Sequence, residues 1–149
     1  MKKTRIILTS VFSIVIITVS FSQQKPRKYI KSDAPFYIVN TGAYKNEIDA
    51  VNAVILLLKK NYKAGYLWIP DFNSLSGAKY FGVFIGPFTT QKQCELMVER
   101  YKKIKPKTYG LLASEEHKRI KINGVGKIKV TENYRIITTN TEVAQKNTT

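Results

Sequence analysis

The sequence predicts an α+β fold in which one antiparallel four-stranded sheet carries two helices on one face. Three observations predict it. Two stretches of the chain match each other, an amphipathic helical pattern follows each stretch, and a further strand pattern follows each helix. With 149 residues, of which 44% are hydrophobic, the chain is long enough for one ordinary domain with a short leader and a tail.

The matching stretches are FYIVNTGAY, residues 36–44, and YFGVFIGPF, residues 80–88. They align at an offset of 44 residues, which places Gly42 on Gly86. Each stretch is rich in β-branched and aromatic residues and stops at a glycine, which is typical of a strand that runs into a turn. The repeat therefore predicts two equivalent strands in the two halves of the domain.

The helical patterns begin after Lys45-Asn46 and after Thr89-Thr90, which suit N-caps. Apolar residues then recur at i, i+3, i+4 and i+7, which indicates one buried face on each helix. The residues expected on these faces are Ala50, Ala53, Val54 and Leu57 in the first helix and Cys94, Met97, Val98 and Tyr101 in the second. Strands follow at 65–69 and 108–113, giving βαββαβ, the split arrangement of ferredoxin-like and RNP-like domains.

Strand parity predicts which side chains lie under the helices, because alternate residues point to opposite faces of a sheet. The side chains expected under the helices are Tyr37, Val39, Phe81, Val83 and Ile85, with Leu67, Ile69, Leu111 and Ala113. The side chains expected on the open face are Phe36, Ile38, Asn40, Tyr66, Trp68, Tyr80, Gly82, Phe84 and Leu112. A solvated sheet face is normally polar, so an aromatic one suggests a binding surface.

These residues resemble the SPOR family of peptidoglycan-binding modules over about residues 35–114. VNTGAY, which ends at Tyr44, is similar to the first-strand pattern V-Q-x-G-[SA]-[FY], and FGVFIGPF, which ends at Phe88, is similar to YRVxVGPF. The resemblance implies recognition of glycan strands that lack stem peptides by the open sheet face, in a cell-envelope or cell-division context. Asn40 stands where the family pattern has glutamine, and Gly82 where it has arginine.

The chemistry of a saccharide site can be matched to the expected open face. A sugar ring offers apolar C–H faces and a belt of hydroxyl groups, so its site needs flat aromatic surfaces and a few amides. The candidate ligand-binding residues are Ile38, Asn40, Tyr66, Trp68, Tyr80 and Phe84, surrounded by Lys63, Lys79, Lys105 and Lys107. Two alternatives remain open: the C-terminal segment or a partner covers these aromatic side chains, or the strand parity is reversed.

The remaining segments suggest export. Residues 1–22 have the basic start, apolar run and small-x-small end of a signal peptide, with an uncleaved anchor as the alternative. Residues 23–34 are expected to be a linker, and 115–149 a basic extension with strands in RIKIN, KIKVT and YRIIT before a disordered tail. The only cysteine is Cys94, which excludes an intrachain disulfide framework and argues against a lipid anchor. The expected location is the periplasm or cell envelope.

Charge and the absence of catalytic motifs favour a binding protein. The net charge is +15, which suits a polyanion, and export makes nucleic acid the least accessible one. No metal-ligand spacing, P-loop or nucleophile elbow appears, so we expect no cofactor, no metal and no enzymatic activity. The predicted function is an exported module that binds peptidoglycan glycan. The alternatives are an envelope protein-interaction module that docks a partner on a second stripe of the first helix, and an RNA-binding domain. That stripe is Ile48, Val51, Ile55 and Leu58.

Overall fold

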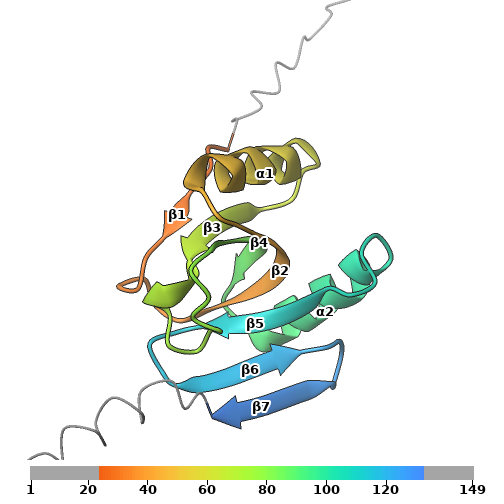
Figure 1. The fold of residues 1–149 in the computed structure, drawn as a ribbon. Coiled ribbons are helices and arrows are strands. Elements are labelled where there is room, and N and C mark those ends of the chain that lie inside the picture. The colour runs from red at the N-terminus through yellow and green to blue at the C-terminus, as the bar shows by residue number, and fades with distance from the viewer. Residues whose placement is uncertain (1–23, 133–149) are drawn as a thin grey trace, which may run out of the picture.

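The structure is a computed structural model that describes residues 24–132. The elements, shown in Figure 1, are β1 (Lys28–Tyr29), β2 (Phe36–Tyr44), α1 (Glu47–Lys59), β3 (Ala64–Trp68), the 3₁₀ turn η1 (Ile69–Asp71), β4 (Phe81–Phe88), α2 (Gln91–Lys102), β5 (Tyr109–Ala113), β6 (Lys118–Ile122) and β7 (Ile128–Glu132). The expected leader and the YRIIT segment lie outside the described residues. Within residues 24–132, no helix has the length and apolar character needed to cross a bilayer.

The sheet has seven strands in the order β1-β3-β4-β2-β5-β6-β7. Its middle, β3-β4-β2-β5, is the antiparallel four-stranded sheet of the βαββαβ prediction. The predicted sheet of four strands is extended to seven, because further strands join both edges. β1 pairs in parallel with β3, and the β6–β7 hairpin continues the sheet beyond β5. The fold is therefore α+β with two helices and a mixed sheet.

Both helices begin at the capping residues that the sequence indicates. The Asn46 side chain accepts a hydrogen bond from the Asp49 backbone N–H at 2.8 Å. Thr90 and Gln93 form a reciprocal capping box at the start of α2. These contacts satisfy backbone donors that the first turn of a helix leaves without partners, so each helix starts directly after its strand.

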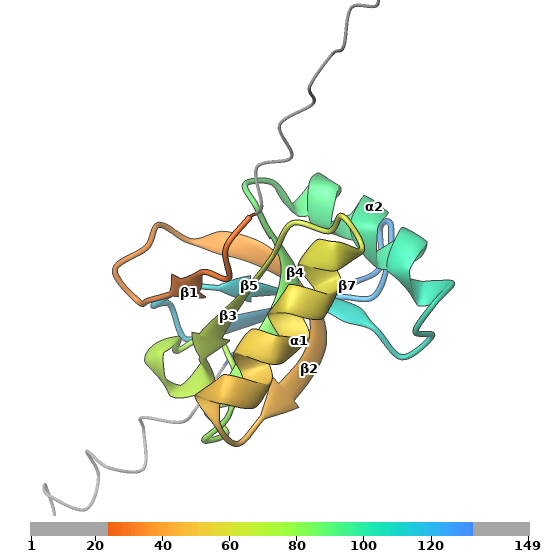
Figure 2. The ribbon, with the colours of Figure 1, turned by 90° about the horizontal axis from the view of Figure 1, so that it is seen from above.

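The two helices cover one face of the sheet (Figure 2). Their buried faces carry Ala50, Val54, Leu57, Cys94 and Val98, and they pack on Val39, Val83 and Ile85 of the central strands as predicted. The close approach of α2 depends on a glycine. A Cβ atom on Gly110 would lie 2.5 Å from the Cys94 sulfur, closer than packed atoms can come.

The predicted parity is wrong for β3 and β5. Tyr66 pairs with Val83 and Trp68 pairs with Phe81, so both aromatic side chains point to the helix-covered face. Leu111 pairs with Ile38, which places Leu111 and its alternate neighbours on the opposite face. Residues of both parities are apolar in these strands, so the apolar pattern could not determine the parity. Cross-strand register determines it instead. The side chains whose predicted sheet face is corrected are Tyr66, Leu67, Trp68, Ile69, Leu111, Leu112 and Ala113.

Strand β6 of the β6–β7 hairpin packs into the domain core. Ile122 is fully buried and belongs to the cluster under α2, where its neighbours include Val98 and Cys94. At the hairpin turn, Glu99 of α2 accepts a hydrogen bond from the Val125 backbone N–H at 3.2 Å. The described part of the basic extension therefore packs on α2 and β5.

We expect Ile122→Ala to lower the free energy of unfolding by about 2–5 kcal/mol, because it removes buried methyl groups and leaves a cavity. The matched control is Val130→Ala on β7, where the side chain is 50% exposed and the cost should stay below about 0.5 kcal/mol. Chemical denaturation of the two variants measures the difference. Equal, small effects would show that the hairpin is not part of the cooperative core.

Candidate functional site

One half of the sheet face opposite the helices is closed by an aromatic cluster. The rings of Phe36 and Phe84 lie 5.9 Å apart, and Tyr29 from β1 lies 5.1 Å from the first and 5.4 Å from the second. Phe72, in the segment after η1, meets Phe36 edge-on at 5.8 Å. These aromatic pairs bury one another, and Phe84 is completely inaccessible. The covered half therefore offers no surface to a ligand.

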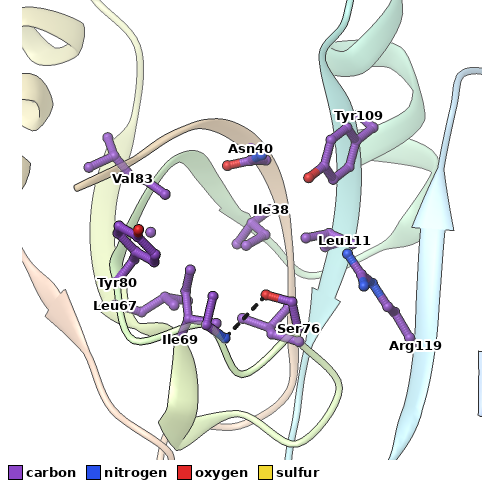
Figure 3. Close-up of a pocket in the computed structure, with 14 residues that line it drawn as sticks. Ile38, Asn40, Leu67, Ile69, Ser76, Tyr80, Val83, Tyr109, Leu111 and Arg119 are labelled. Carbon is purple, nitrogen blue, oxygen red and sulfur yellow. Dashed lines mark hydrogen bonds between the residues drawn. The ribbon is translucent and has the colours of Figure 1, made fainter. Parts of the chain in front are cut away.

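The other half of this face holds a hollow of about 150 Å³ (Figure 3). Its lining comes from β2, β3, β4, β5, β6 and the segment between β3 and β4. The lining residues are Ile38, Asn40, Ala43, Leu67, Ile69, Leu75, Ser76, Ala78, Tyr80, Gly82, Val83, Tyr109, Leu111 and Arg119. Pockets that enclose drug-sized ligands have roughly 300–1,000 Å³. This hollow is smaller, so it suits one edge of an elongated ligand that continues across the surface.

The segment between β3 and β4 forms one wall and is tied down at its base. The Ser74 hydroxyl donates to the Leu112 carbonyl at 2.7 Å and accepts from the Ser114 N–H at 2.9 Å. Asn73 donates to the Glu115 carbonyl at 2.8 Å. These bonds join the segment to the end of β5, so the wall is positioned before any ligand binds.

Two tyrosines flank the hollow. Tyr80 and Tyr109 stand on opposite sides of it, with Asn40 and Ile38 between them (Figure 3). No described residue forms a hydrogen bond with the Asn40 side-chain amide, which leaves a donor and an acceptor for a ligand. A side chain on Gly82 would start 3.3 Å from Ile69, so glycine keeps this part of the hollow open. The arrangement combines flat aromatic surfaces, an amide and an apolar floor.

Positive charge reaches the same hollow from β6. Arg119 lines it and extends across β5 toward Leu111 (Figure 3). The Lys121 ammonium lies 4.5 Å from the centre of the Tyr109 ring, a cation–π contact. Lys105 does not line the hollow, and its ammonium donates to the Thr41 carbonyl of β2. No aspartate or glutamate is among the lining residues. The electrostatic character of the site is therefore cationic.

The structure brings three of the six sequence-predicted site residues together. Ile38, which is 4% exposed, contributes to the floor, and Asn40 and Tyr80 line the hollow. Phe84 lies on the predicted face but in its closed half. Tyr66 and Trp68 lie on the helix side, where the Tyr66 hydroxyl donates to Glu47 at 3.1 Å and the Trp68 ring packs on Phe81. The register of β3 therefore removes Tyr66 and Trp68 from the predicted site on the open sheet face.

Sequence reasoning missed Tyr109 and Arg119. Tyr109 pairs with Asn40 across β2 and β5, and it was hidden by the inverted parity of β5. Arg119 alternates with Ile120 and Ile122 in KRIKI, and this alternation already indicated a strand with one apolar and one basic face. What the pattern could not indicate was that β6 would pair with β5 and so bring its basic face to the site.

The family model for the SPOR domain matches residues 33–108, just over half of the chain. This chain belongs to the SPOR domain family. The family is a peptidoglycan-binding family of the cell envelope and is generally non-catalytic. Comparisons with curated proteins and with solved structures gave no match. The matched segment contains β2 to α2 and most of the hollow, whereas β1, β5, β6 and β7 lie outside it.

Cys94 is packed in the SPOR core and is not placed to act as a nucleophile. Its sulfur is fully buried and donates to the Ile38 carbonyl at 3.4 Å. Burial, with a smaller contribution from Glu95, raises the pKa of the thiol to about 12. Between residues 24 and 132 there is also no cluster of side chains that could hold a metal ion.

We expect native Cys94 to react with an aromatic disulfide reagent at pH 8 at least about 1,000-fold more slowly than in denaturant. The thiolate is the reactive form, and the folded protein keeps this thiol protonated and inaccessible. Absorbance of the released thiolate measures both rates. Rapid labelling of the native protein would contradict the buried position.

Proposed function

We propose that this SPOR domain binds peptidoglycan glycan strands at the hollow flanked by Tyr80 and Tyr109. The observation that carries the proposal is the meeting of two aromatic side chains, a free amide and a cationic rim at the hollow on the sheet face opposite the helices. Tyrosine rings can pack on the C–H faces of sugars, and the Asn40 amide can pair with hydroxyl or acetamido groups.

The positive charge of the whole chain supports the same ligand class. The sequence has 25 lysine and arginine residues against 10 aspartate and glutamate residues. Long-range attraction concentrates an acidic polymer near the surface without choosing the part that is bound. The short-range contacts in the hollow then select the saccharide. Long-range attraction and short-range contacts contribute separately to binding, and the experiment must distinguish them.

The test is co-sedimentation of the protein with amidase-treated peptidoglycan. We expect Tyr80→Ala combined with Tyr109→Ala to reduce binding at least about 10-fold, because each aromatic contact is worth roughly 0.5–1.5 kcal/mol beyond the area it buries. The matched control is Trp68→Ala, which removes an aromatic side chain from the helix side and should retain binding. Thermal unfolding of the variants checks the fold. Undiminished sedimentation of the double variant would show that charge alone drives binding.

We further propose that residues 1–22 direct the protein across the membrane and are then removed. The basic start and the apolar run up to Val19 support this proposal, and Ser20-Phe21-Ser22 suits signal peptidase. The mature chain would function in the periplasm or cell envelope, in keeping with the family, and cell division is one process that it could serve there.

Expression in a bacterial host should therefore yield a mature protein that begins at Gln23. Intact-mass measurement of the protein from the envelope fraction checks the cleavage position. A retained leader would indicate an N-terminal anchor instead.

The helix side supports a second candidate function, the docking of an envelope protein. Ile48 at the start of α1 is 74% exposed, and Leu56 and Leu96 are also exposed. The predicted stripe is only partly available, because Val51 and Leu58 pack against the core. A protein-interaction role would be favoured if the co-sedimentation assay showed no glycan binding.

A further inference from the structure

Arg119 stands out because it belongs to the hollow but not to the segment that matches the family. It lies on β6, beyond residue 108, where the family match ends. Its neighbours Ile120 and Ile122 pack into the core on the helix side. Since alternate residues of a strand face opposite ways, Arg119 and Lys121 must project onto the ligand-binding side of the sheet. The register of β5 with β6 then carries Arg119 to the rim of the hollow.

The Arg119 guanidinium has no partner among residues 24–132. The ion pairs in that range join Arg27 to Asp33 and Lys28 to Glu47, and neither involves the hollow. The guanidinium donates no hydrogen bond to a described residue either. Lys121, by contrast, already rests on the Tyr109 ring. Arg119 is partly buried and presents a planar set of donors that fits a carboxylate in two-pronged geometry.

We propose that Arg119 is a specificity residue that pairs with a free carboxylate on the bound saccharide, an inference that rests on the proposed glycan-binding function. The sugars of a glycan strand are neutral except for the lactyl group of muramic acid. That group is an amide while the stem peptide is attached and becomes a carboxylate when the peptide is removed. A guanidinium at the rim of the hollow therefore favours the stripped strand, because only that strand carries a carboxylate on the lactyl group itself.

The experiment compares two soluble glycan oligosaccharides of equal length. One carries free lactyl carboxylates, and in the other these groups have been reduced to neutral alcohols. Titration calorimetry at physiological salt gives the affinity of each for the full protein. We expect wild-type protein to prefer the acidic ligand by about 10-fold or more, because hydrogen bonds to a charged group are the stronger class.

Arg119→Ala and Arg119→Gln should both abolish this preference, because they should weaken binding of the acidic ligand more than binding of the neutral one. Glutamine retains an amide and much of the side-chain length, so it separates the loss of charge from the loss of contact area. The matched control is Arg100→Ala, which removes an exposed guanidinium from α2 on the helix side and should preserve the preference. Arg119→Lys should retain part of it, because an ammonium group cannot form the two-pronged pair.

The outcomes separate this inference from the function on which it rests. Wild-type protein that binds both ligands equally, or an Arg119→Ala variant that keeps the preference, would overturn the role of Arg119 and leave glycan binding intact. Equal losses in Arg100→Ala and Arg119→Ala would assign the effect to net charge and also overturn it. Failure of wild-type protein to bind either ligand would overturn both proposals.

Discussion

Burial of the β2–β4 pair on both faces is the constraint on which the rest of the structure depends. On one side Val39 and Ile85 lie under the helices, and on the other Phe36 and Phe84 lie under Tyr29 and the segment after η1. Two covered faces stabilise the centre of the sheet but leave little of it for a ligand. The open hollow exists only because the aromatic cover stops before it reaches Asn40. The position of the site therefore follows from where the packing of the domain ends.

The sequence predicted an element well where its apolar residues follow a single period, that of a helix or that of a strand. Strand β2 and both helices have clear patterns, and their caps at Asn46 and Thr90 are local in the chain. Strand β3 shows why the facing of side chains was harder to predict. In AGYLW both sets of alternate residues can be buried, so only the pairing of Tyr66 with Val83 decides which set meets the helices. The short strand β1 could not be predicted from an apolar pattern, because two residues are too few to show one. Its pairing with β3 defines it instead.

The site was harder to predict than the fold because it is assembled from segments far apart in the sequence. Asn40 and Tyr80 could be chosen from the alternation of their own strands. Tyr109 could be placed only through its register with Asn40, and Arg119 only through the addition of β6 to β5. Gly82 stands where the family pattern has arginine, so this strand brings no guanidinium to the face. The structure supplies a guanidinium to the same hollow from another strand.

Arg119 and the exposed lysines would contribute to ligand binding in different ways. The lysines attract an acidic polymer at long range, whereas Arg119 is placed to contact a group of the ligand directly. Exposed charges act over a screening distance of about 8 Å at physiological salt, and their effect on a polyanion is spread over the surface. A partly buried guanidinium in a hollow with no acidic lining is screened less than an exposed ammonium group. Its interaction depends on where the ligand carries its charge and not only on how much charge it carries. A domain with this arrangement can be strongly basic overall and still discriminate between saccharides that differ in a single carboxyl group.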